Sequence, residues 1–235
     1  MRQHQRFQKQ SSTYLVRILS KRLIGGVDDA GRGCIIGPLV LAGVALEESK
    51  ISKLTEIGVR DSKTLTPSAR ARLYSLIKNL AYKVVSLKVP PEEVDRYVAR
   101  RKKFIRLNLL EAEAAAKIIE ELEADLVYID ASDTDPERFK KNVIALIKRE
   151  VEVISEHNAD KTYPIVSAAS IVAKVERDAE IAKLHERYGN FGSGYPADPS
   201  TIAFLKEWLG KYGEIPPFAR KTWKTWRRLV DGRLM

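Results

Sequence analysis

Two adjacent aspartates, Asp28 and Asp29, stand between a hydrophobic run and a Gly-Arg-Gly turn in the stretch GVDDAGRG. Negative charge at a strand end needs a positive neighbour, which could be a metal ion, a substrate cation or a buried arginine. Neighbouring side chains on a regular strand point to opposite faces, so both carboxylates could reach one metal only at a strand end or a bulge. The pair indicates a charged site and leaves its counter-ion open.

Two further aspartates occur in similar settings. Asp130 ends the strand-like run LVYID, and Asp160 lies in EHNADKTYP, after another strand-like run and before a helix. Strand ends meet at one edge of an α/β sheet, and carboxylate oxygens are the ligands that Mg²⁺ and Mn²⁺ prefer. Each aspartate alone is more typical of a cap or a turn. Only the convergence of all four would make a metal site.

The turn formed by Gly31, Arg32 and Gly33 has what a nucleic-acid backbone needs. Glycines allow close approach and leave amide groups pointing outward, and arginine is a forked phosphate donor. A plain alternative is a tight turn whose arginine neutralises Asp28 or Asp29. The three glycines at 31, 33 and 37 do not make a dinucleotide fingerprint, because a strand-like run follows where that motif requires a helix.

Other polar residues are open to two interpretations. Ser62 and Lys63 precede a predicted helix and could bind a phosphate, or could be a cap and a solvated lysine. Tyr195, taken alone, is typical of a loop aromatic that packs beneath GSGYP. The polar residues of SAASIVAKVERD, which follow helical spacing, favour close helix–sheet packing over substrate contact: Ser167, Ser170, Lys174 and Arg177.

The elements that would position these residues alternate between strands and helices. Strands are expected over LIGGVDD, PLVLAGVAL, YKVVSLKV, DLVYIDA and VEVISEH, and the main helices over LTPSARARLYSLIKNL, PPEEVDRYVARR, RLNLLEAEAAAKIIEELEA and SAASIVAKVERDAEIAKLHERY. Two short aromatic-rich helical stretches close the chain. This alternation predicts an α/β sheet. A Gly/Pro loop at residues 189–199 is the one plausible boundary.

The chain of 235 residues carries a net charge of +10, and residues 1–23 contain no acidic residue. Such basic ends favour a polyanionic partner, nucleic acid first, although a surface rich in Lys, Arg and Glu of the thermophile type is an equal alternative. A single cysteine, Cys34, excludes an internal disulfide framework and indicates a reducing, cytoplasmic location. No apolar run is long enough to cross a membrane.

Several of these stretches, taken together, resemble ribonuclease HII, particularly its archaeal form and the related eukaryotic catalytic subunit. They run in the family's order from about residue 24 to residue 227: GVDDAGRG, VRDSKTLTPSAR, VYIDASDTDPERF, HNADKTYPIVSAASIVAKVERD, GSGYPADP and RKTWKT. The resemblance implies an α/β fold of the RNase H-like type, a mixed central sheet flanked by helices, with a C-terminal helical region. On this basis we expect a basic arm at 1–23, a catalytic domain at 24–190 and a helical region at 191–235.

The resemblance also implies a function. The family's four carboxylates correspond to Asp28, Asp29, Asp130 and Asp160, its Gly-Arg-Gly motif to Gly31, Arg32 and Gly33, and its junction-sensing tyrosine to Tyr195. The implied reaction is hydrolysis of RNA in RNA/DNA hybrids and cleavage 5′ of ribonucleotides in duplex DNA. It uses two Mg²⁺ or Mn²⁺ ions about 4 Å apart and leaves 3′-hydroxyl and 5′-phosphate ends.

One residue departs from the family pattern. The second carboxylate of the family is usually glutamate, and here it is Asp29. Loss of one methylene shortens the reach toward a metal, so Asp29 could act through water or a shifted backbone. Two other functions therefore remain open, another RNase H-like nuclease such as a junction resolvase, and a hybrid-binding protein with weakened catalysis. We expect a monomer with no membrane association and no clear tail for binding a sliding clamp.

Overall fold

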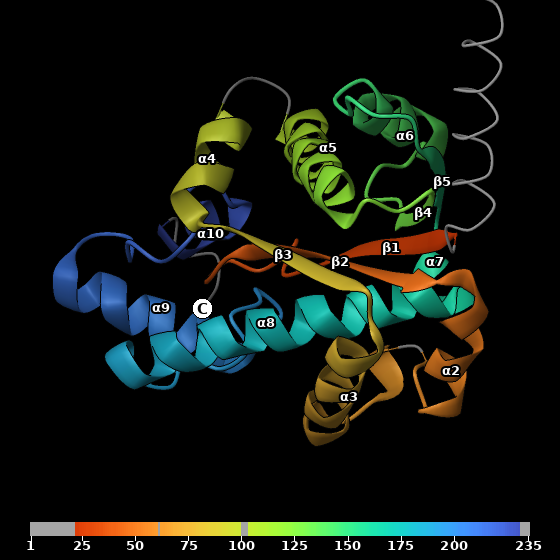
Figure 1. Ribbon diagram of the computed structural model, residues 1–235. Coiled ribbons are helices and arrows are strands. Elements are labelled where there is room, and N and C mark those ends of the chain that lie inside the picture. Colours follow the sequence, from red (N-terminus) through yellow and green to blue (C-terminus); the bar gives the residue numbers. More distant parts are fainter. Residues whose placement is uncertain (1–21, 61, 100–102, 231–235) are drawn as a thin grey trace, which may run out of the picture.

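The computed structural model describes residues 22–60, 62–99 and 103–230, and its centre is one mixed five-stranded sheet of order β3-β2-β1-β4-β5 (Figure 1). Strands β1 and β2 pair antiparallel, as do β2 and β3, whereas β4 runs parallel to both β1 and β5. The strands are β1 (Leu23–Ala30), β2 (Leu39–Glu47), β3 (Lys83–Val89), β4 (Leu126–Asp130) and β5 (Glu152–Glu156).

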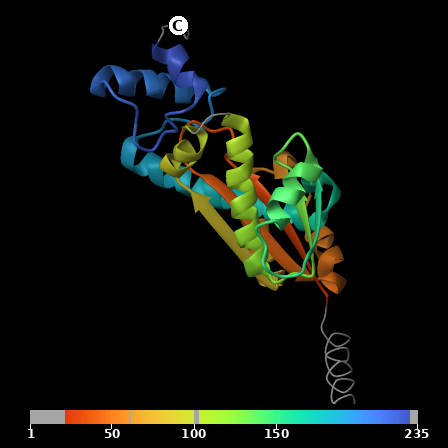
Figure 2. The same cartoon turned by 90° about the horizontal axis from the view of Figure 1, so that it is seen from above.

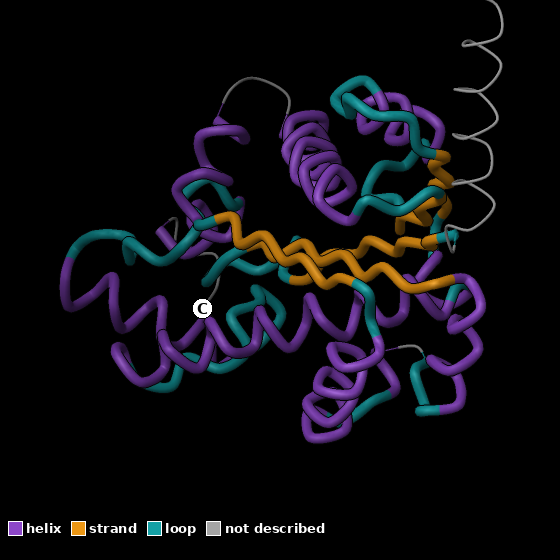
Figure 3. Tube along the Cα trace, viewed as in Figure 1, coloured by secondary structure: helices purple, strands orange, loops and turns teal. Residues whose placement is uncertain are grey.

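Helices cover both faces of this sheet. Figures 1 and 3 show α4, α5 and α6 on one face and α2, α3 and α8 on the other. The helices are α2 (Ile51–Glu56), α3 (Pro67–Leu80), α4 (Pro91–Ala99), α5 (Lys103–Leu122), α6 (Pro136–Ile144), α7 (Ala159–Thr162), α8 (Pro164–Tyr188), α9 (Pro199–Tyr212) and α10 (Lys224–Val230), with short 3₁₀ turns at Glu48–Lys50 and Ser62–Thr64.

Helix α8 packs unusually close to β1. A side chain at Gly26 would place its Cβ 2.4 Å from the carbonyl oxygen of Ile165, so only glycine allows this approach. The first half of α8 is correspondingly a run of small and β-branched buried residues, 165–173. The predicted close packing of this helix on the sheet is confirmed, and it brings the α8 residues Ser170 and Lys174 alongside the end of β1.

The sequence predicted the five strands and the long helices in their observed order. Helix α3 begins where its Thr66 cap and Pro67 indicate, with Thr66 Oγ1 accepting from the amide of Ala69 at 3.2 Å. Helix α6 was not predicted, although its start carries the same kind of signal. Asp135 accepts from two first-turn amides and Pro136 occupies the first helical position.

The C-terminal region packs on the rest of the chain through aromatic residues. Figure 2 shows α9 and α10, in blue, gathered at one end of the molecule beyond the sheet. Trp223 and Trp226, near the end of the chain, are buried. A cluster of rings joins the end of α8 to α9 and the following loop, comprising Tyr188, Phe191, Phe204, Trp208 and Phe218.

The predicted division at residues 23 and 190 stays a prediction, and residues 1–21 of the basic arm lie outside the described part of the chain. None of the helices in the described ranges has the length and apolar character of a membrane span.

Candidate metal and nucleic-acid site

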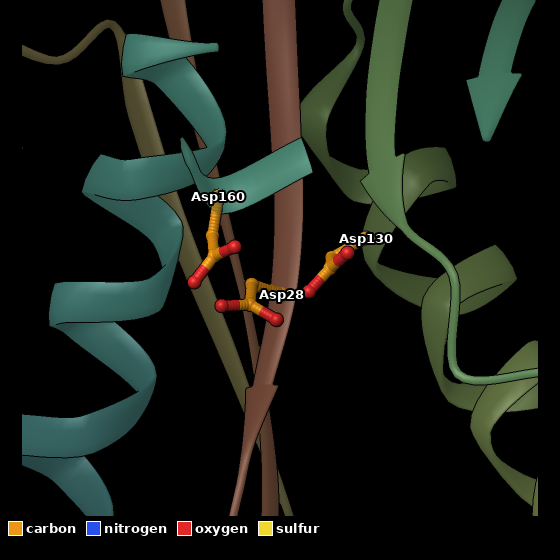
Figure 4. A group of neighbouring side chains, drawn as sticks. All are labelled: Asp28, Asp130 and Asp160. Atoms are coloured by element: carbon orange, nitrogen blue, oxygen red, sulfur yellow. The ribbon is translucent and has the colours of Figure 1, made fainter. Parts of the chain in front are cut away.

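Three of the four predicted aspartates come together where neighbouring strands end. Asp28 lies near the end of β1, Asp130 is the last residue of β4, and Asp160 follows β5 in the short helix α7 (Figure 4). One carboxylate oxygen from each lies within 4.8 Å of the other two. The parallel pairing that sets Val27 beside Ile129 carries Asp28 and Asp130 to the same edge. The predicted convergence of strand ends therefore holds for these three.

Two hydrogen bonds fix the position of the short helix α7, which carries Asp160. Asp130 Oδ1 accepts from the amide of Ala159 at 3.1 Å, which ties the start of α7 to the end of β4. The hydroxyl of Ser167, in the first turn of α8, donates to the carbonyl oxygen of Asp160. Backbone and side chain thus fix the distance between β4 and the helix that carries Asp160.

The electrostatics of this triad (Asp28, Asp130 and Asp160) favour a cation. Burial, together with the charges of Asp29 and Asp130, raises the pKa of Asp28 from 3.8 to about 8, although Lys174 and Ser170 act in the opposite direction. A buried carboxylate is ionised at neutral pH only at a cost, and a divalent cation bound to it removes that cost. The oxygen-only donor set fits Mg²⁺ or Mn²⁺.

Asp29 lies on the other face of β1. The β1–β2 register is continuous through Asp28 and Asp29, which pair with Ala42 and Leu41, so the strand has no bulge here. Asp29 is consequently not part of the triad. Burial raises its pKa, and Arg32 is the largest of the influences that lower it.

Arg32 is held by two buried residues of α5 that sequence reasoning missed. Its Nε donates to Glu111 Oε1 at 2.7 Å and its Nη2 to Asn108 Oδ1 at 2.7 Å. Of the two aspartates that the sequence allowed Arg32 to neutralise, Asp29 is the one whose pKa the charge of Arg32 lowers. Burial, with the charge of Asp29, raises the pKa of Glu111 to about 8 in spite of Arg32. Helix α5 carries several other charged residues, so nothing in its sequence singled out these two.

A pocket of about 360 Å³ opens beside Asp29 and the Gly-Arg-Gly turn. Tyr195 lines it, half-buried, and the guanidinium of Arg177 lies over its ring at 4.8 Å from the centroid. Tyr195 therefore lies at the predicted site. The other lining residues include three cations that the sequence did not place there, and the full set is Asp29, Ala30, Gly31, Arg32, Gly33, Ser62, Arg70, Lys174, Arg177, Asp178 and Tyr195.

Ser62 also reaches this pocket, although it is itself buried. Its hydroxyl is 2.9 Å from that of Ser170, which in turn accepts from Lys174 Nζ at 2.8 Å. Ser62 does not cap α3, because Thr66 does. The side chain of Lys63 lies outside the described residues. Asp178 contacts Arg177 and Arg70 at 3.4 and 3.5 Å.

Known proteins are similar to this chain in both sequence and fold. The sequence model of the family described as ribonuclease HII matches residues 25–226. The chain belongs to the ribonuclease HII family. Ribonuclease HII of Thermofilum pendens is 46% identical over 210 residues, which cover 88% of this chain and 98% of that protein.

Two solved structures agree. The ribonuclease H2 of Pyrococcus horikoshii OT3 superposes with a TM-score of 0.82 at 44% identity, covering 89% of this chain and 98% of that one. The ribonuclease HII in a PCNA complex from Archaeoglobus fulgidus gives a TM-score of 0.79 at 42% identity, covering 88% and 96%.

Family membership confirms the predicted RNase H-like fold and the predicted class, a metal-dependent endoribonuclease of the ribonuclease HII type. The individual site residues, the preferred metal and the absence of a clamp-binding tail stay predictions. Residues 231–235, where such a tail was sought, lie outside the described part of the chain.

Proposed function

We propose that this member of the ribonuclease HII family hydrolyses the RNA strand of RNA/DNA hybrids and cuts 5′ of single ribonucleotides in duplex DNA. The products would carry 3′-hydroxyl and 5′-phosphate ends. One observation carries the proposal: three converging carboxylates, on an oxygen-only site, lie at the end of the strand that runs directly into the Gly-Arg-Gly turn. Asp28 of the proposed metal site and Gly31 of the proposed ribose reader are only three positions apart along the chain.

The cofactors of the proposal are two Mg²⁺ or Mn²⁺ ions, with Asp28, Asp130 and Asp160 as the direct ligands and Asp29 as an outer one. When bound, such ions supply a nucleophilic water and stabilise the charge that develops on the leaving oxygen. The raised pKa of Asp28 supports this assignment, because the site then gains from any cation that neutralises it.

The turn would identify the ribonucleotide. The 2′-hydroxyl is the one group that distinguishes RNA from DNA at a single nucleotide, and backbone amides at Gly31 to Gly33 can donate to it. Arg32 is fixed by Glu111 and Asn108, so it approaches a phosphate without free rotation. Tyr195, held under Arg177, offers its ring to the adjoining deoxyribose.

Three cations near the carboxylates would hold the substrate backbone. Arg70, Lys174 and Arg177 all line the pocket beside Asp29. Several carboxyl groups lie near the pocket, and their negative charge would repel a polyanion. The substrate could therefore approach only where these cations and bound metal compensate that charge. Binding should weaken steeply as salt is added.

Cleavage of three duplexes separates this function from its alternatives. They are an RNA/DNA hybrid, a DNA duplex with one ribonucleotide and a four-way DNA junction, each tested in Mg²⁺ and in Mn²⁺. We expect cutting of the first two, with the single-ribonucleotide duplex cut immediately 5′ of the ribose.

The other outcomes would each overturn the proposal. Junction cutting without ribose dependence would indicate a resolvase. Hybrid binding without cleavage in either metal would indicate a binding protein in which Asp29 has weakened catalysis.

A further inference from the structure

Three consecutive carbonyl groups of the Gly-Arg-Gly turn accept hydrogen bonds from one C-terminal stretch, residues 220–223. Arg220 Nη2 donates to Gly31 O at 2.6 Å and Nη1 to Arg32 O at 2.8 Å. Trp223 Nε1 donates to Gly33 O at 3.3 Å. Residues 220–223, here called the anchoring segment, are nearly two hundred positions away in sequence, yet they bind each carbonyl of the turn.

These contacts fix the direction of the turn's amide groups. In a trans peptide, the carbonyl and the following N–H belong to one plane and point in opposite directions. A carbonyl of Gly31 that points at Arg220 therefore turns the amide of Arg32 away from it, and the carbonyl of Arg32 does the same for the amide of Gly33. Among the described residues, neither of these two amides has a protein acceptor. Both remain available for a ligand oxygen.

Arg220 is built into the core. It is fully buried, and its guanidinium also donates to Gly37 O at 3.3 Å and lies over the Trp223 ring at 4.9 Å. Its own amide donates to Ile35 O at 2.8 Å. Burying a guanidinium charge costs free energy, which these hydrogen bonds offset. Its forked donors match two adjacent carbonyls, which a lysine cannot do.

A second contact secures the anchoring segment from the opposite side. Asp95, on α4, accepts from the amides of Lys221 and Thr222 at 2.7 and 3.0 Å and from the Thr222 hydroxyl at 2.6 Å. The segment is thus held between α4 and the turn. A change at Asp95 can loosen it without touching the pocket.

We propose that Arg220 is a positioning residue for ribose recognition, which orients the amides of Arg32 and Gly33 through their peptide planes, with Asp95 holding the segment that carries it. The inference deepens the proposed function and rests on it. It assigns the C-terminal segment a part in substrate discrimination.

The test compares Arg220→Lys with two other variants. Asp95→Asn perturbs the anchoring segment from α4. Arg149→Lys is the matched control, because Arg149 also donates to backbone carbonyls, Ile119 O at 2.9 Å and Glu150 O at 3.4 Å, far from the pocket. For each protein, kcat and KM are measured on the single-ribonucleotide duplex, alongside the dissociation constant for the same duplex without ribose and the affinity for Mn²⁺.

We expect Arg220→Lys to lower kcat at least tenfold and Asp95→Asn to lower it about two- to fivefold, with all-DNA binding and Mn²⁺ affinity within twofold of the wild type. Arg149→Lys should match the wild type throughout. Unchanged kcat in Arg220→Lys would overturn this inference but not the proposed function. So would a loss of all-DNA and Mn²⁺ binding as large as the loss of kcat. Failure of the wild type to cut at the ribonucleotide would instead overturn the proposed function.

A spectroscopic measurement keeps the inference testable if Arg220→Lys folds poorly. The chain contains 13 glycines, so selective ¹⁵N-glycine labelling gives a simple amide spectrum. In Asp95→Asn, the Gly33 amide should shift while glycines remote from the turn, such as Gly58 and Gly213, should not. A Gly33 signal that stays in place in Asp95→Asn would contradict the proposal.

Discussion

The two faces of one strand treat adjacent aspartates in opposite ways. Asp28 meets two more carboxylates, and its pKa stays raised although Lys174 and Ser170 of α8 act in the opposite direction. Asp29 faces a side where Arg32 is already paired with Glu111. The strand alternation of period two separates a face where three carboxylates gather from a face where Arg32 is paired with the buried Glu111.

Adjacency in sequence is therefore a weak guide to which residues belong to the same site. Asp130 and Asp160 are far from Asp28 in sequence but share its site, because parallel pairing of β1 with β4 and the turn after β5 bring them there. Asp29 is next to Asp28 but acts from the neighbouring pocket. The following predictions test this separation.

The largest effect should come from Asp28→Asn. The substitution keeps the shape of the side chain but removes one of three charges that bind the cation, and we expect kcat on an RNA/DNA hybrid to fall about 10³-fold, the loss of roughly 4 kcal/mol of transition-state stabilisation. Steady-state cleavage in saturating Mg²⁺ measures it. A loss below tenfold would remove Asp28 from the metal site.

Asp29 should matter less. Asp29→Asn should lower kcat about tenfold in the same assay, because Asp29 lies outside the triad and acts on it through the field or through water. Asp29→Glu should raise activity or leave it unchanged, since the longer side chain is the one usual in the family. A clear fall in Asp29→Glu would mean that this site is tuned to aspartate.

The raised pKa of Asp28 has a consequence for stability. The pKa of Asp28 is 3.8 in the unfolded chain and about 8 in the folded protein, so the folded state binds more protons between these pH values. The free energy of unfolding therefore falls as pH rises through that window. Without metal, Asp28→Asn should therefore melt several degrees above the wild type at pH 9.

At pH 3 the difference should nearly disappear, because Asp28 is then largely protonated in both states. Saturating Mg²⁺ at pH 9 should reverse the order, since only the wild type has the full triad. Melting curves at both pH values, with and without metal, follow this directly; a wild type that is the more stable protein at pH 9 without metal would refute the assigned pKa.

The smallest effect should be that of Glu111→Gln. Burial raises the pKa of Glu111 to about 8, so at neutral pH it is mostly protonated and a neutral isostere changes little. Glutamine also keeps an oxygen that can accept from Arg32. We expect kcat to stay within about threefold, whereas Glu111→Leu, which removes that acceptor, should cost more; equal losses in both would show that the charge is required.

Much of the fold could be predicted because its signals are local. Strand alternation, the Thr66 cap and the long apolar faces of α5 and α8 lie in continuous sequence. The positions of Asp130 and Asp160 followed from strand ends, which are also local. The family resemblance added the roles of the turn and Tyr195.

The partners of the turn could not be predicted, because they depend on tertiary contacts. Glu111 looks like one more acidic residue on a helix, and nothing near it indicates that Arg32 will bury it. Arg220 looks like one cation in a basic stretch, although it is among the largest fully buried side chains in the described chain. Long-range polar pairs leave no periodic pattern, so sequence spacing does not identify them.

Titration of the metal-free protein with Mn²⁺, followed by calorimetry, measures directly whether Asp28 binds the metal and Asp29 does not. The proteins to compare are the wild type, Asp28→Asn and Asp29→Asn at one neutral pH. We expect Asp28→Asn to weaken Mn²⁺ binding at least tenfold and Asp29→Asn to stay within about threefold of the wild type, because only Asp28 belongs to the triad. Equal weakening in the two variants would contradict the separation of the two faces of β1.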